Sequence, residues 1–211
     1  MGQKKNPYAR PDEFTKRAKA AGYPARSVFK LEEIDRRCRL FRPGMRVLDL
    51  GCAPGSWLMY AAQKVGGQGS VRGIDLTPLE IVMPRNAQAI AGDALSLEGP
   101  VRAFVDEGGP YDVVVSDMAP ATTGNRFSDQ ARSAELVRGT LAVAERVLAP
   151  GGAWVAKIFM SEDLVSIRAD VRRAFTEERV LRPEGVRKVS YEVFLVGLGK
   201  RAHVDDGGAG S

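Results

Sequence analysis

Short apolar runs alternate along the chain with amphipathic segments, and this alternation predicts a doubly wound α/β fold with a mostly parallel sheet. Strands are expected where β-branched and aliphatic residues cluster, at residues 46–50, 70–75, 87–91, 111–116, 153–158, 187–189 and 192–198. Helices are expected in the gaps, most clearly at residues 56–65, 133–148 and 161–175. The pattern contains no internal repeat.

Two more helices are predicted ahead of the sheet, at residues 11–21 and 27–39. The turn sequence Gly22-Tyr23-Pro24 separates them, and Ser27 can serve as the N-cap of the second helix. Apolar residues recur on one face of that helix, at Val28, Leu31, Ile34 and Cys38. The second helix is therefore expected to be amphipathic.

The composition is that of one soluble globular domain. The chain has 211 residues, of which 44% are hydrophobic and 27% charged, so it is long enough to bury a full core. No apolar run approaches the roughly 18 residues needed to span a bilayer, and the N-terminus lacks the apolar stretch of a signal peptide. We expect a cytoplasmic protein. Cys38 and Cys52 lie far apart and His203 is the single histidine, so neither a disulfide framework nor a zinc site is expected.

Positive charge is concentrated at the N-terminal end. The net charge is +5, but residues 1–46 hold 13 Lys or Arg against 5 Asp or Glu, so the rest is slightly acidic. This segregation favours a nucleic-acid partner, although a solvated basic helix would have the same composition. We interpret residues 1–42 as a docking extension of a single domain that ends near residue 200. Residues 201–211, rich in glycine, are expected to form a disordered tail.

A glycine-rich turn follows the first predicted strand, where Asp49 to Trp57 read DLGCAPGSW. In α/β folds such a turn lets the backbone approach a ligand closely, and the following helix presents its free N–H groups. Gly51 and Gly55 have Pro54 between them, so the GxGxxG fingerprint of nicotinamide dinucleotide sites fails at its second glycine. The turn predicts a site for an adenosine-bearing cofactor and argues against an NAD-linked oxidoreductase.

Two aspartates extend this predicted cofactor site. Asp75 ends the second strand, where a carboxylate can accept hydrogen bonds from the ribose hydroxyls of an adenosine. Asp93 follows the third strand and can receive the exocyclic amine of adenine, although either aspartate could instead be a helix cap. Because a phosphate-binding GK[ST] loop is absent, S-adenosylmethionine fits better than NAD or ATP. Trp57 is either a core aromatic or a wall of the cofactor pocket, and Cys52 is interpreted as small packing.

Four charged residues are candidates for the chemistry. Asp117 follows the apolar run Val113-Val114-Val115, at the sheet edge where ligands bind in open α/β folds. Lys157 interrupts another apolar strand, and desolvation would favour the neutral, basic form of a lysine there. Glu192 opens the last strand, and Lys30 lies on the helix before the sheet. Each alone has an ordinary explanation, since a strand-edge lysine usually extends to solvent.

Together these residues resemble the RrmJ/FtsJ ribosomal RNA ribose 2′-O-methyltransferases. The resemblance covers residues 8–199 and rests on DLGCAPGSW, Lys30 in SVFKLEEID, Asp117 in DMAP, Lys157 in AKIF and Glu192 in SYEVF. It implies a Rossmann-like class I methyltransferase with a seven-stranded, mostly parallel sheet and an antiparallel last strand. It also implies a Lys-Asp-Lys-Glu catalytic tetrad of these four residues, and an S-adenosylmethionine site lined by Gly51, Gly55, Trp57, Asp75, Asp93 and Asp117.

The resemblance further implies a substrate, a uridine ribose in the 23S RNA of the large ribosomal subunit, methylated on the assembled 50S particle. We expect direct in-line methyl transfer by a monomer without a metal, with Lys157 taking the proton of the 2′-hydroxyl as general base or polarising its oxygen. Asp117 and Glu192 would orient the two lysines, and Lys30 would help to place the ribose or a phosphate.

Two segments depart from the family pattern, and neither includes a tetrad residue. Ser56 stands where a second glycine is common, and residues 121–124 read ATTG in place of Asn-x-Ser-Gly. Among alternatives, an amino-group methyltransferase would show an aromatic residue after the fourth strand, which Asp117-Met118-Ala119-Pro120 lacks. An RNA-binding ribosome-assembly factor with the same fold and little catalysis is also considered, but the intact tetrad argues against it.

Overall fold

The computed structural model describes residues 13–184, 186 and 190–202. Its strands are β1 (Arg46–Leu50), β2 (Ser70–Asp75), β3 (Ala87–Ala91), β4 (Tyr111–Ser116), β5 (Leu148–Phe159), β6 (Phe175–Leu181) and β7 (Glu192–Lys200). Its helices are α1 (Glu13–Ala20), α2 (Val28–Cys38), α3 (Ser56–Val65), α4 (Gly99–Gly108), α5 (Arg126–Val147) and α6 (Asp163–Ala174). None of the helices in this part of the chain has the length and apolarity needed to span a bilayer.

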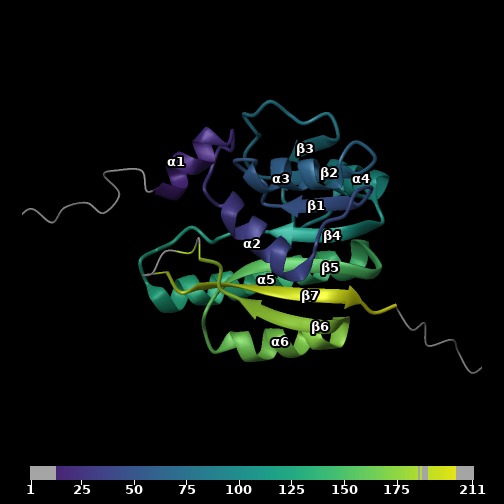
Figure 1. The fold of residues 1–211 in the computed structure, drawn as a ribbon. Coiled ribbons are helices and arrows are strands. Elements are labelled where there is room, and N and C mark those ends of the chain that lie inside the picture. Colours follow the sequence, from purple (N-terminus) through teal and green to yellow (C-terminus); the bar gives the residue numbers. More distant parts are fainter. Residues whose placement is uncertain (1–12, 185, 187–189, 203–211) are drawn as a thin grey trace, which may run out of the picture.

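The seven strands form one sheet in the order β3-β2-β1-β4-β5-β7-β6, with helices on both faces (Figure 1). Neighbouring strands from β3 to β5 are parallel, whereas β7 is antiparallel to both β5 and β6. The expected Rossmann-like sheet, mostly parallel with an antiparallel last strand, is therefore confirmed.

Most predicted elements lie where the hydrophobic pattern indicated, with the predicted bounds for β1, β2, β3, β4 and α3. The strand β6 was not predicted, because the charged residues Glu177, Glu178 and Arg179 interrupt its apolar pattern. Such a sequence is tolerated at a sheet edge. The strand predicted at residues 187–189 lies outside the described residues, as do residues 1–12 and most of the predicted tail, from residue 203 onward.

The helices α5 and α2 differ from the prediction at their N-termini. The helix α5 begins at Arg126 rather than residue 133, since the side chain of Asn125 accepts a hydrogen bond from Ser128 N (3.1 Å). Ser27 precedes α2 as expected, but its side chain forms no capping hydrogen bond. The apolar face of α2 is confirmed, because Val28, Leu31 and Ile34 are buried.

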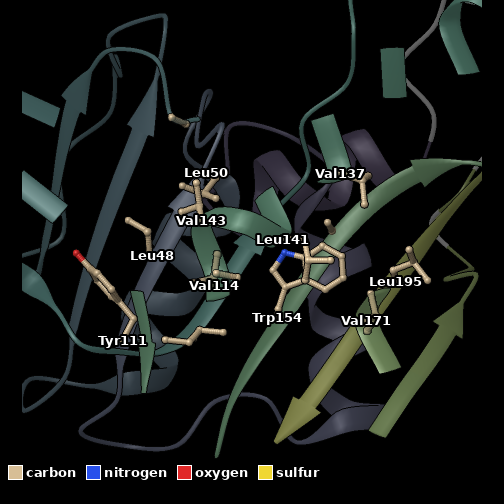
Figure 2. Close-up of a cluster of buried hydrophobic side chains, with 14 of the residues drawn as sticks. Leu48, Leu50, Tyr111, Val114, Val137, Leu141, Val143, Trp154, Val171 and Leu195 are labelled. Carbon is tan, nitrogen blue, oxygen red and sulfur yellow. The ribbon is translucent and has the colours of Figure 1, made fainter. Parts of the chain in front are cut away.

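Alternate residues of each strand pack into two cores, one on each face of the sheet. On one face, Leu48, Val114, Trp154 and Leu195 pack with residues of α4, α5 and α6, and Figure 2 shows Trp154 among several of these side chains. On the other face, the intervening strand residues pack with residues of α1, α2 and α3. Two helical layers therefore cover the sheet, one on each face. Because successive side chains of a strand point to opposite faces, the position of a polar residue in its strand determines which helical layer it faces.

Candidate active site

The carboxyl ends of β1 to β4 surround a cavity of about 320 Å³. Its lining includes four residues predicted for the cofactor site: Gly51, Asp75, Asp93 and Asp117. Parallel strands place all their carboxyl ends at one edge of a sheet, so residues far apart in the sequence meet there. The volume lies within the range of small-molecule sites.

Gly51 allows the backbone to form one side of this cavity. Its φ is +76°, and a Cβ at this position would lie 2.0 Å from Cγ of Met118. The N–H groups of Gly51 and Cys52 both donate to the carbonyl oxygen of Ile74, at 2.8 and 3.1 Å. A larger residue would be strained and would collide with Met118, so glycine is required at this turn.

Asp75 and Asp93 are held by backbone hydrogen bonds. Asp75 accepts from Ala53 N through Oδ2 (2.9 Å) and from Thr77 N through Oδ1 (2.8 Å), and Asp93 accepts from Leu95 N through Oδ1 (2.9 Å). Each carboxylate oxygen has a further lone pair, so both side chains can also accept hydrogen bonds from a ligand. Two oriented acceptors beside a glycine turn fit the ribose and adenine of an adenosyl group.

Gly55 and Trp57 are not brought to the cavity wall. Gly55 is the N-cap of α3 and has a φ of +107°, and a Cβ there would lie 2.7 Å from Cδ1 of Ile81. Trp57 is 3% exposed, donates from Nε1 to the carbonyl oxygen of Ser27 (2.9 Å), and has its ring centroid 5.8 Å from that of Phe194. Of the two predicted roles, the position of Trp57 supports the core aromatic and not the pocket wall.

The four predicted catalytic residues form one contiguous cluster, which we call the tetrad. Lys157 Nζ lies 2.9 Å from Oδ1 of Asp117 and also donates a hydrogen bond to the Asp117 carbonyl oxygen. Lys30 Nζ lies 2.5 Å from Oε1 of Glu192 and 3.9 Å from Oδ1 of Asp117. Asp117 therefore lies between the two lysines, and Glu192 pairs with Lys30.

The strand alternation explains why these charges meet. Lys157 follows Val155 by two residues and Glu192 precedes Phe194 by two, so both face the helical layer that contains α2. Because β7 is antiparallel to β5, its first residue lies at the same sheet edge as the last residues of β5, with Phe159 opposite Glu192. The helix α2 then places Lys30 over this edge.

Burial and charge act in opposite directions on Glu192. Burial alone would raise the pKa of this carboxyl, but Lys30 beside it, Lys157 and a hydrogen bond from Ser190 lower the pKa below its ordinary value. The side chains of Lys30, Asp117, Lys157 and Glu192 are 11%, 18%, 9% and 14% exposed. The cluster is therefore partly shielded from water but still open to a substrate.

Sequence reasoning did not identify two features of this site. Asp49 is 1% exposed, and neither carboxyl oxygen has a hydrogen-bond partner among the described residues. The position of Asp49 at the start of DLGCAPGSW, directly before the glycine turn, was the signal from which its place in the site could have been predicted. The apolar residues Leu95, Met118 and Leu136 were also not predicted to line the cavity, and no signal identifies Leu136, which lies within α5. Burial raises the pKa of the Cys52 thiol, which agrees with a packing role rather than a nucleophilic one.

The chain is similar to a known family and to several proteins from other organisms. The model of a family described as FtsJ-like methyltransferase matches residues 23–200. The ribosomal RNA large subunit methyltransferase E of Sorangium cellulosum is 60% identical over 198 residues, which cover 94% of this chain and 92% of that protein. The protein of the same name from Desulfatibacillum aliphaticivorans is 50% identical over 191 residues, covering 90% of this chain and 91% of its own.

Two solved structures share the fold. A protein from Plasmodium falciparum described as a ribosomal RNA methyltransferase has a TM-score of 0.75 at 21% identity, over 84% of this chain and 98% of its own. Fibrillarin from Aeropyrum pernix, solved with natively bound S-adenosyl-L-methionine, has a TM-score of 0.54 at 19% identity, over 74% of this chain and 67% of its own.

Proposed function

This chain belongs to the FtsJ-like methyltransferase family, and on that premise we propose that it methylates the ribose 2′-hydroxyl of a uridine in large-subunit ribosomal RNA. The substrate is the assembled large-subunit particle, and the enzyme acts on it as a cytoplasmic monomer. The observation that supports this proposal most directly is the tetrad, which lies beside the cofactor cavity at one edge of the sheet.

The cofactor is S-adenosylmethionine, which supplies an activated methyl group on its sulfonium. The cavity between the strand ends is the proposed place for it. Asp75 would accept hydrogen bonds from the ribose hydroxyls, Asp93 would receive the adenine amine, and the backbone at Gly51 would allow close approach. Asp117 lines the same cavity and also belongs to the tetrad, so it connects the donor site with the acceptor site.

Lys157 is proposed to act on the 2′-hydroxyl as general base. Its Nζ donates a hydrogen bond to the Asp117 carbonyl oxygen and lies 2.9 Å from Oδ1 of the same residue, so the amine is held at the sheet edge by one residue. A neutral amine held there would accept the proton of the 2′-hydroxyl through its lone pair, and an ammonium would polarise the oxygen through an N–H.

The other members of the tetrad are proposed to position Lys157 and the ribose. Asp117 fixes the direction of the Lys157 side chain and balances its charge, and Glu192 does the same for Lys30. Lys30 then presents a fixed positive charge to the ribose or to a neighbouring phosphate. Since the sulfonium already activates the methyl group, orientation of the oxygen provides much of the rate enhancement.

The test is methyl transfer from labelled S-adenosylmethionine to large-subunit particles, with the product scored as ribose or base modification. We expect Lys157→Ala to lower the rate roughly 10²- to 10⁴-fold, the usual contribution of a general base. Calorimetry should show nearly unchanged cofactor binding. Lys200→Ala is the matched control, because Lys200 lies at the opposite end of β7 and should leave the rate unchanged.

Two outcomes would contradict the proposal in different ways. Near wild-type turnover of Lys157→Ala would remove the general-base role from Lys157. A wild-type protein that binds particles but transfers no methyl group to ribose would instead favour the alternative, a ribosome-assembly factor with the same fold and little catalysis.

A further inference from the structure

A groove separate from the cofactor cavity lies between the N-terminal ends of α5 and α6. Its volume is about 820 Å³, and its lining includes Phe127, Ser161, Glu162 and Asp163. None of its lining residues belongs to the cofactor cavity. The cofactor and the tetrad do not account for this groove.

One side of the groove is aromatic and cationic. Phe127 is 83% exposed, although an aromatic side chain of this size is usually buried. Beside it, the guanidinium of Arg126 lies 5.1 Å from the ring centroid of Tyr191, whose ring packs edge-on against Phe159 at a centroid distance of 4.9 Å. An exposed aromatic ring next to a guanidinium is typical of sites that stack an unpaired nucleobase.

The opposite side of the groove is acidic and hydroxylic. Glu162 and Asp163 provide carboxylates, and Asp163 is paired with Arg138 at 3.0 Å. The hydroxyl oxygen of Ser161 is buried and has no hydrogen-bond partner within the described residues. Carboxylates repel phosphates but accept hydrogen bonds from the amino and imino groups of bases. The groove is therefore suited to the edge of a base rather than to the RNA backbone.

The groove adjoins the tetrad through Tyr191. Glu192 directly follows this residue, and the Tyr191 carbonyl oxygen accepts a hydrogen bond from Met160 N (2.9 Å). Met160 also lines the groove, and its own carbonyl oxygen accepts a hydrogen bond from Gln130. A strand with its ribose at the tetrad would thus have a neighbouring nucleotide at the mouth of the groove.

We propose that this groove binds an unstacked base of a nucleotide next to the methylated ribose, with Phe127 stacking on the base. The exposed carboxylate of Glu162 accepts a hydrogen bond from an amino or imino group on its Watson–Crick edge. This inference rests on the proposed function and adds a second determinant of target choice. Phosphate contacts position an RNA, whereas base contacts select its sequence.

The first test compares Phe127→Leu with Phe127→Trp in methylation of large-subunit particles. Loss of one stacked base should lower kcat/KM roughly 5- to 150-fold in the leucine variant, while tryptophan retains the stacking face and most of the activity. Val165→Ala is the control, because Val165 is an exposed apolar residue of α6 that is 74% exposed and does not line the groove. All three variants should bind S-adenosylmethionine like the wild type. A leucine variant with wild-type kcat/KM would overturn the inference.

The second test places a photoreactive phenylalanine analogue at position 127 of the full chain and maps cross-links on the particle. Cross-links to a base beside the target ribose are expected. Cross-links to a ribosomal protein alone would overturn the inference and make the groove a protein-docking surface. The mapping does not depend on methyl transfer. If the wild-type protein modifies no ribose, the proposed function fails, whereas a cross-link from position 127 to an unstacked base still supports base binding in the groove and a cross-link to protein alone still contradicts it.

Discussion

Asp49 differs from the other aspartates at the carboxyl edge of the sheet, because its side chain has neither solvent nor a hydrogen-bond partner within the described chain. Burial, followed by the charges of Asp117 and Asp75, raises its pKa well above the ordinary value. Asp75 and Asp93, by contrast, accept backbone hydrogen bonds at the cavity. Carboxylates at one edge of the sheet thus occupy two different environments.

A raised pKa in the folded state predicts that Asp49 makes stability fall as the pH rises. Above the unfolded pKa of about 3.9 the unfolded chain loses this proton while the folded chain retains it, so the free energy of unfolding decreases until the folded pKa is passed. The variant Asp49→Asn lacks this ionisation. Its Tm relative to the wild type should therefore increase between pH 4 and pH 9 in thermal unfolding followed by circular dichroism. A Tm difference independent of pH would contradict the assignment.

For single residues, the sequence predicted the position in the fold more accurately than the surroundings of the side chain. Asp75, Asp93 and Asp117 could be found because each follows an apolar strand, a position with a general meaning in α/β folds. The role of Trp57 could not be decided, since a tryptophan after a glycine turn can face either the ligand or the core. Its burial against Phe194 depends on β7, which is more than 130 residues later in the sequence.

Among the elements, α2 connects the tetrad to the distant β6 and the segment that follows it. Glu33 of α2 accepts a hydrogen bond from Glu184 N through Oε2 (2.7 Å) and pairs with Arg37 through Oε1 (2.6 Å). Arg179 of β6 donates to the carbonyl oxygen of Arg37 (3.1 Å). These contacts fix the helix that places Lys30, so the edge strand affects the active site although it contributes no residue to it.

We predict that Glu33→Ala destabilises the protein and slows methyl transfer. The substitution removes the hydrogen bond from Glu184 N to the buried carboxylate, and a hydrogen bond to a charged group contributes about 1.5–3 kcal/mol. The adjacent Glu32 is exposed, so Glu32→Ala should stay within about 0.5 kcal/mol of the wild type. Urea unfolding measures the first effect and particle methylation the second. Equal stability of the two variants would show that this contact does not anchor α2.

The strand β6 also shows which elements could not be predicted from the sequence. Four strands were predicted with correct bounds because their apolar runs end abruptly. In β6 the charged residues Glu177, Glu178 and Arg179 interrupt the apolar run, so this signal is missing. Its order in the sheet, outside β7, is a long-range pairing that no local pattern contains.

For the whole molecule, the separation of positive and negative charge along the chain affects how it would bind RNA. Residues 1–46 are strongly basic and the remainder is slightly acidic, so one end of the chain is proposed to dock on RNA. Of the lysines assigned to this docking extension, Lys4 and Lys5 lie outside the described residues, whereas Lys16 is exposed on α1 and pairs with Glu13 at 2.9 Å.

Reversal of Lys4, Lys5, Arg10 and Lys16 to glutamate should weaken binding to ribosomal particles and reduce its salt dependence. Each lost phosphate contact lowers the slope of log affinity against log salt by about 1. The affinity for S-adenosylmethionine should not change, because the cavity lies at the strand ends. Filter binding over a salt series gives both quantities. An unchanged slope would place the RNA dock elsewhere on the molecule.

The position of β7 between β5 and β6 also determines when the enzyme becomes complete during its own synthesis. The strand β6 leaves the ribosome before β7, yet within the described chain it pairs with β7 alone. Until β7 emerges, β6 has no strand partner and Lys30 lacks Glu192. Insertion of β7 therefore completes both the sheet and the tetrad in one late step. A nascent chain that has not yet inserted β7 cannot have an assembled active site.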